Sequence, residues 1–206
     1  MTLFSNFARR IALAFAVAAF VAASPVFAAT PAEDFVSSKI QAGLAILNDS
    51  HLSAGQRQGQ FEQLLLAATD MKRVATFTLG RYADRASPAD KDAFAAAFQN
   101  YAIAVYQSYL GKYAGQTLTV TGSTAPAVDD AVVSAVLNEP GGKNGMQIDF
   151  RVRSNTGAPV IVDFSVAGMW LAPSERDQFV AFLDRSNGNI SALIAHLDEL
   201  RAKLRS

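Results

Sequence analysis

The spacing of apolar residues changes twice along this chain, and that change constrains the fold most strongly. From residue 31 to about 113 apolar side chains recur every three to four residues, the spacing of a helix face. From 116 to 171 they alternate with polar side chains, as in strands with one buried face. Helical spacing then returns over 173–204. We therefore predict an α+β fold of several helices packed on an antiparallel sheet.

The middle region is expected to contain about four strands. Leu118 and Val120 alternate with threonines, 132–137 is a nearly continuous apolar run, and 146–153 alternates strictly. A turn at 154–157 then leads into a strand over 160–166. Consecutive strands joined by short turns predict a curved antiparallel meander.

The first 28 residues have the pattern of a cleaved secretory signal peptide. Arg9 and Arg10 precede an apolar run over 11–23, and a small-x-small motif ends at Ala28. A membrane-spanning helix needs roughly 20 apolar residues, so a permanent anchor is the weaker interpretation. We expect residues 29–206 to form one exported domain.

The composition excludes several classes of protein. The chain has no cysteine, hence no disulfides, no thiolate metal ligands and no lipoprotein anchor. Removing residues 1–28 takes two arginines and no acid from 18 basic and 18 acidic residues, leaving 16 against 18. A slightly negative, soluble protein gives no reason to expect nucleic acid as a partner.

A long helix expected over about 88–113 has apolar residues on two sides. One side carries Phe94, Phe98, Tyr101, Val105, Tyr109 and Tyr113. Ile103, Tyr106 and Leu110 form a second apolar side. Such a helix must be covered on both sides or line a cavity. Ordinary core packing explains the stripe, but its tyrosines favour the edge of a cavity, because a buried hydroxyl needs a partner.

A search for catalytic or metal-binding residues finds little. The two histidines, His51 and His196, have no neighbours at ligand spacing. Nucleophile-elbow, Ser-x-x-Lys and His-Glu-x-x-His motifs are missing from the sequence. The glycine-rich turn at 141–145 leads into a strand and lacks the Gly-Lys-Ser/Thr of a phosphate loop. We therefore expect no enzyme, no metal and no cofactor.

Three segments resemble a known family. They are Leu79-Gly80-Arg81-Tyr82, then Ser87-Pro88 leading into Phe94, Phe98 and Tyr101, and then Phe164-x-Val166-x-Gly168 followed by Leu171, Arg176, Gln178 and Phe179. Together they make the region 33–204 similar to the MlaC, or toluene-tolerance, family of periplasmic lipid-binding proteins, including its hopanoid-associated relative HpnM. The chain departs from the family pattern at Ala83, Glu175 and Met169-Trp170. For Arg81 we expect hydrogen bonds to backbone carbonyls of the Gly80 turn.

The resemblance implies a carrier that shuttles a phospholipid between an outer-membrane lipoprotein complex and an inner-membrane ABC transporter complex. It would thereby maintain the lipid asymmetry of the outer membrane. The acyl chains would enter a cavity between the sheet and the helices. We expect the cavity wall to include Phe77, Leu79, Tyr101, Val105, Tyr106, Tyr109, Val136, Ile148, Phe150, Val166 and Trp170. The final helix is amphipathic, and we expect it to pack on its own domain in a monomer.

Three alternatives remain open at this point. The ligand could be a hopanoid, or the protein could be an envelope adaptor whose interior is filled by its own side chains. It could also be an enzyme, since NTF2-like folds of this appearance host catalysts in other families. An enzyme would need a carboxyl in the cavity, from Asp149 or Asp163. Both acids are otherwise candidates to pair with Arg151 and Arg153 on a solvated strand face, an interpretation favoured over contact of these arginines with an anionic headgroup.

Overall fold

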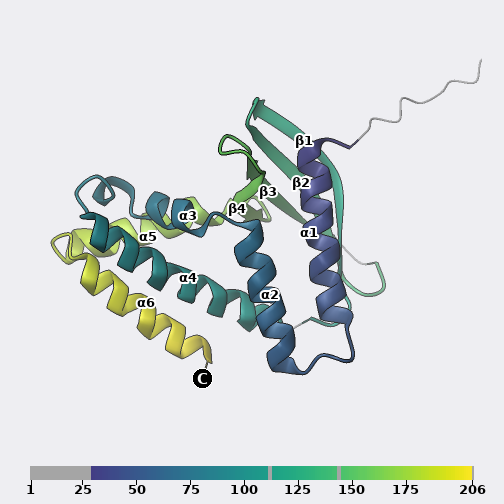
Figure 1. Cartoon of the computed structure of the whole chain (residues 1–206), viewed down its shortest axis with the longest axis horizontal. Coiled ribbons are helices and arrows are strands. Elements are labelled where there is room, and N and C mark those ends of the chain that lie inside the picture. The colour runs from purple at the N-terminus through teal and green to yellow at the C-terminus, as the bar shows by residue number, and fades with distance from the viewer. Residues whose placement is uncertain (1–28, 111–112, 143–144, 206) are drawn as a thin grey trace, which may run out of the picture.

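The computed structural model describes residues 29–110, 113–142 and 145–205 and confirms the α+β fold (Figure 1). Four α-helices precede the sheet: α1 (Pro31–Asn48), α2 (Ala54–Ala68), α3 (Met71–Thr78) and α4 (Pro88–Leu110), with a 3-10 turn η1 (Gly80–Tyr82) before α4. Two helices follow it, α5 (Leu171–Arg185) and α6 (Ile190–Arg205). The expected signal peptide lies outside the described residues.

The sheet is an antiparallel meander with the strand order β1-β2-β3-β4-β5. Its strands are β1 (Thr117–Ala127), β2 (Asp130–Asn138), β3 (Met146–Arg153), β4 (Val160–Val166) and β5 (Met169–Trp170). The two-residue β5 is the strand that alternation could not indicate. It forms because the chain reverses at Ala167 and Gly168, whose φ angles are 50° and 83°.

Local sequence signals define where the first helices begin. Thr30 and Ser53 cap α1 and α2, and Glu33 and Gln56 complete the two capping boxes. Asp70 caps α3 in the same way, because its side chain accepts a hydrogen bond from the backbone N–H of Arg73. The helix expected from Pro173 instead begins two residues earlier, at Leu171. A proline is tolerated there because the first N–H groups of a helix have no intrahelical partner.

Helices α3, α4, α5 and α6 gather at one end of the molecule around a densely packed core (Figure 1). Phe94 is fully buried, and its ring meets the Phe179 ring edge-on at 6.0 Å between centroids. Leu183, Leu193 and Leu197 are also fully buried in this core. At the other end α1 packs on β1 and β2, where Val36, Val133 and Val152 form a smaller cluster.

The Leu79-Gly80-Arg81-Tyr82 segment follows α3 and packs against α5. Gly80 has a φ of 54°, and a Cβ there would lie 2.7 Å from Val180 Cγ2, so glycine is required. Arg81 and the Tyr82 hydroxyl both donate to the Asp184 carboxylate. The expectation that Arg81 binds backbone carbonyls was wrong, because Asp184 on the neighbouring helix offers a charged acceptor.

Candidate functional site

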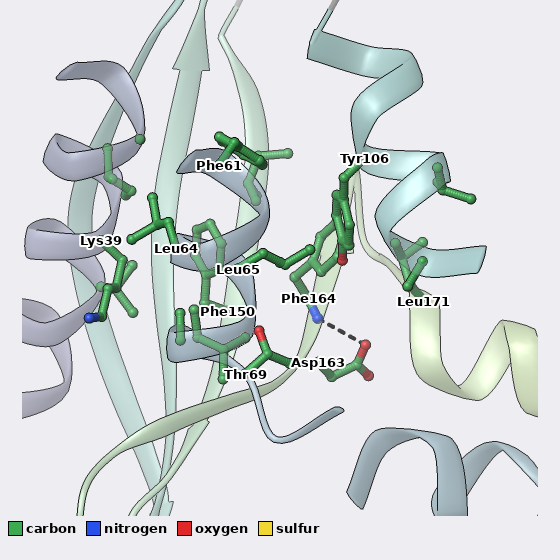
Figure 2. Close-up of a pocket in the computed structure, with 18 of the residues that line it drawn as sticks. Lys39, Phe61, Leu64, Leu65, Thr69, Tyr106, Phe150, Asp163, Phe164 and Leu171 are labelled. Carbon is green, nitrogen blue, oxygen red and sulfur yellow. Dashed lines mark hydrogen bonds between the residues drawn. The ribbon is translucent and has the colours of Figure 1, made fainter. Parts of the chain in front are cut away.

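A cavity of about 440 Å³ lies between the sheet and helices α1, α2 and α4, with the start of α5 at one side (Figure 2). Its size falls within the roughly 300–1,000 Å³ that is typical of small-molecule sites. The wall is predominantly aliphatic and aromatic. Within the described part of the chain, three lining residues carry ionisable acid or base groups other than tyrosine: Lys39, Asp163 and Glu175.

Helices α1 and α2 supply one side of the wall through the face that each turns inward. On α1 this face is Val36, Lys39, Ile40, Gly43, Leu44 and Leu47, and on α2 it is Phe61, Leu64, Leu65 and Ala68. The spacing of three and four residues places these side chains on a single face of each helix. A helix with one apolar face must bury it, and here that face borders the cavity.

The sheet supplies the back of the cavity through alternate residues of β3. Ile148 and Phe150 line it, and Phe150 is paired with Phe164 of β4. The pairing register then shifts: Arg151 pairs with Asp163, Val152 pairs with Ile161, and Val162 between them has no partner on β3. Ile161, Val162 and Asp163 consequently all border the cavity.

Helix α4 contributes the aromatic side opposite α1. Tyr101, Ala102, Val105 and Tyr106 line the cavity, and the Tyr106 ring lies 5.7 Å from the Phe164 ring between centroids. The Tyr101 hydroxyl donates to Glu175 Oε1 at 3.3 Å. Burial raises the pKa of Tyr106 well above its ordinary value, so this phenol stays neutral.

The two acids of the cavity are partly desolvated. Burial raises the pKa of Asp163, although hydrogen bonds from the backbone N–H groups of Ala172 and Phe164 oppose that rise. Both N–H groups reach Asp163 Oδ1 at 2.9 Å, so this carboxylate caps the start of α5. Burial also raises the pKa of Glu175, opposed by the hydrogen bond from Tyr101. The roles of both acids are therefore explained by packing and capping.

The outer face of the sheet carries a separate polar network. Asp149 accepts hydrogen bonds from Ser134, Ser165 and Gln147, and it does not line the cavity, because its neighbours Ile148 and Phe150 point the other way. Burial favours a higher pKa for Asp149, but these three hydrogen bonds together hold it below its ordinary value.

The partner of Arg151 and Arg153 differs from the expectation. Asp130, only 5% exposed, accepts hydrogen bonds from Arg151, the shorter at 2.7 Å, and forms an ion pair with Arg153 at 3.1 Å. The hydrogen bond from Arg151 lowers the pKa of Asp130. Asp130 takes this place because the β2–β3 register sets it directly opposite Arg153.

Five of the eleven expected wall residues do line the cavity: Tyr101, Val105, Tyr106, Ile148 and Phe150. The structure places Leu79 in the helical core, fully buried, and Phe77 on the surface, 43% exposed beneath the Arg176 guanidinium. Val136 and Trp170 pair with Gln147 and Ser165 on the outer face of the sheet.

Val166 shares a face with Ile148 but does not border the cavity. The Tyr109 side chain lies outside the description.

Sequence reasoning missed the contribution of α1 and α2. Their apolar stripes are visible in the sequence, but nothing in a stripe separates a face that lines a cavity from one that packs in a core. The leucines and isoleucines of these stripes also lack the hydroxyl by which the tyrosines of α4 indicate the edge of a cavity. The useful signal was the presence of two amphipathic helices before a sheet with a single covered face.

The described residues contain neither a metal-binding cluster nor a helix that could span a membrane. Over 29–110, 113–142 and 145–205, three or more His, Cys, Asp or Glu side chains never come together in a metal-binding arrangement. The helices of the same ranges are too short or too polar to span a membrane.

The whole arrangement is similar to a solved structure of the phospholipid-binding protein from Ralstonia solanacearum in complex with a phospholipid. The TM-score is 0.75 at 24% sequence identity, and the match covers 86% of this chain and 100% of that chain. This likeness is one of fold. A family model described as "MlaC protein" also matches residues 37–199, which is most of the chain. The chain therefore belongs to the MlaC protein family.

Proposed function

We propose that this protein is a soluble, non-catalytic carrier that binds a phospholipid by its acyl chains in the cavity between the sheet and α1, α2 and α4. The observation that carries this proposal is the apolar cavity of about 440 Å³. The phospholipid in the complex of the Ralstonia solanacearum protein supports it. The cavity residues Tyr101, Val105, Tyr106, Ile148 and Phe150 would then contact the chains.

The energetics of burial favour a carrier that unloads only on a partner. Moving two acyl chains, with about 30 methylenes in total, from an apolar cavity into water costs roughly 24 kcal/mol of free energy, at about 0.8 kcal/mol for each methylene. Spontaneous release would be negligibly slow. We infer that loading and unloading occur when the carrier docks on an outer-membrane lipoprotein complex or an inner-membrane ABC transporter complex. Transfer would then maintain the lipid asymmetry of the outer membrane.

The proposed compartment is the periplasm. Export follows from the signal peptide pattern of residues 1–28, and family membership agrees with it. The ionisable groups of the cavity give no support to catalysis. Asp163 is engaged as the cap of α5, and Glu175 is bound to Tyr101.

The deciding experiment is native mass spectrometry of protein exported to a bacterial periplasm and purified without detergent, followed by extraction of the bound material. A stoichiometric phospholipid would support the proposal. A bound hopanoid would show that the cavity binds lipid but that the ligand is not a phospholipid. A protein free of lipid, which also fails to take up phospholipid from vesicles, would overturn the proposal and favour an adaptor. Rapid transfer between vesicles without any partner would contradict the docking step.

A further inference from the structure

The charged groups of the cavity wall are separated by sign. Lys39 lies on α1, whereas Asp163 and Glu175 lie on β4 and α5. Figure 2 shows Lys39 on the α1 side and Tyr106, Asp163 and Leu171 on the other side of the cavity. The apolar residues Leu64, Leu65 and Phe150 are drawn between these two sides. The two sides of the wall are therefore electrostatically different.

Lys39 is the cationic residue of the wall. It is the one lysine or arginine among the described residues that line the cavity. Its Nζ lies 5.3 Å from the centroid of the Phe35 ring on the preceding turn of α1, and it makes no ion pair within the described part of the chain. The charge is therefore not neutralised by a carboxylate and is available to an anion.

The orientation of Lys39 places its charge on the α1 side of the cavity and away from the carboxylates. Its aliphatic stem borders the cavity, while its amino nitrogen points away from Phe150 and Asp163 (Figure 2). Lysine often lies this way, with its methylenes against apolar groups and its charge toward water. An amphiphile whose chains fill the cavity would thus meet a positive charge on the α1 side.

The opposite side disfavours an anion. The carboxyl oxygens of Asp163 and Glu175 accept hydrogen bonds from Ala172, Phe164 and Tyr101, so they present acceptors rather than donors. A phosphate there would face like charge in a poorly solvated environment. The adjoining rings of Tyr106 and Phe164 instead offer an apolar surface.

We propose that the bound lipid has a fixed orientation, with its phosphate at Lys39 on α1 and its chain ends between α4 and β4, near Tyr106 and Phe164. This orientation rests on the proposed function and adds the residue that recognises the phosphate of the lipid. Lys39 acts as a specificity-determining residue. Its ammonium forms a charge-assisted hydrogen bond to a phosphate oxygen, which a neutral diacylglycerol cannot accept.

The orientation is tested with two photoactivatable phosphatidylethanolamines, one with a diazirine at the end of an acyl chain and one with a diazirine in the headgroup. The chain probe should label residues 101–106 or 171–175, and the headgroup probe should label 35–43. Reversed or indiscriminate labelling of a lipid-loaded protein would overturn the orientation alone. A protein that takes up neither lipid would overturn the proposed function itself.

The role of Lys39 is tested by comparing phosphatidylethanolamine with diacylglycerol of the same chains. Lys39→Gln should weaken retention of the phospholipid about three- to ten-fold and leave diacylglycerol unchanged. Lys39→Arg, which keeps a positive charge at this position, should retain most of the phospholipid binding of the wild type. Lys72→Gln, which removes an exposed lysine paired with Asp92 on the helical end, is the matched control and should change neither. Equal losses of both lipids in Lys39→Gln would contradict the proposal.

Discussion

Helix α4 runs through two apolar regions that differ in how they are filled. In its first half, Phe94 and Phe98 are buried, with edge-on contacts to Phe179 of α5. In its second half, Tyr101, Val105 and Tyr106 border a cavity of about 440 Å³. The same helical pattern therefore faces a closely packed core at one end and lines a cavity at the other, and Phe98 borders both.

The difference separates stability from binding. Native cores are packed as closely as organic crystals, and their side chains contribute to stability through contacts that a void cannot make. The cavity wall forgoes such contacts, so α4 depends on α3, α6 and the Phe179 ring of α5 to hold it in place. We expect substitutions in the two regions to act on different measurable quantities.

The largest expected effect is in the packed region. Phe94→Ala should lower the free energy of unfolding by about 3–5 kcal/mol, because the ring is fully buried and the surrounding rings cannot close the gap. Urea unfolding followed by circular dichroism measures this loss. The molecules that remain folded should still retain lipid, as native mass spectrometry can show. A loss below about 1 kcal/mol would mean that this end is not the stabilising core.

A pair of identical substitutions on α4 gives the sharpest contrast. Ile103 is 5% exposed and does not line the cavity, whereas Val105, two residues later, does. Ile103→Trp should destabilise the fold by about 1–3 kcal/mol through overpacking and spare lipid binding. Val105→Trp should change stability by less than about 1 kcal/mol, since the added ring enters the cavity.

The readouts for this pair are the melting curve and the amount of lipid bound per folded molecule. Val105→Trp should bind at least about ten-fold less lipid, because its indole occupies the volume of the acyl chains. Unchanged binding by Val105→Trp, or equal destabilisation by both variants, would refute the distinction between the two sides of α4.

The sheet behind the cavity is held on its outer face by charge as well as by packing. Asp130→Asn should cost about 1.5–3 kcal/mol at neutral pH, because it weakens the hydrogen bonds from Arg151 to a nearly buried carboxylate and removes the ion pair with Arg153. In the wild type this contribution is fully present above the ordinary Asp pKa of 3.8 and is lost as pH falls through the lowered folded pKa.

Unfolding free energies measured between neutral and acidic pH check this behaviour. The difference between wild type and Asp130→Asn should shrink as the pH falls below the ordinary Asp pKa. A difference that is independent of pH would show that the carboxylate charge is not what matters at this site.

Much of the fold follows from local sequence. The period of two in β3 assigns Ile148 and Phe150 to the face opposite Asp149, and the caps at Thr30, Ser53 and Asp70 define helix starts without tertiary information. These features were predictable because each depends on residues within a few positions of one another.

The candidate site was less predictable because it depends on which faces meet. The sequence predicts both Leu79 and Val105 in the cavity wall, yet Leu79 is buried in the helical core and Val105 borders the cavity. The register shift opposite Val162 brings Asp163 to the cavity edge, and no local residue pattern indicates such a bulge. The partner of Arg151 and Arg153 likewise depends on strand register.

The smallest expected effect concerns Glu175 at the cavity wall. Burial raises its pKa above the ordinary 4.5, so the folded protein binds this proton more tightly than the unfolded chain. The free energy of unfolding therefore decreases as pH rises from the ordinary Glu pKa through the raised folded pKa. Glu175→Gln removes this dependence and keeps an oxygen acceptor for the Tyr101 hydroxyl.

We expect Glu175→Gln to gain less than about 1 kcal/mol over the wild type at pH 7, with the gain disappearing near pH 4. Glu199→Gln, an exposed change on α6, is the matched control and should leave the pH profile unchanged. A gain at pH 7 would mean that desolvation of the Glu175 carboxyl destabilises the fold. Loss of stability at pH 7 would instead show that the charge of Glu175 supports the fold, which would place this side of the cavity with the stabilising core.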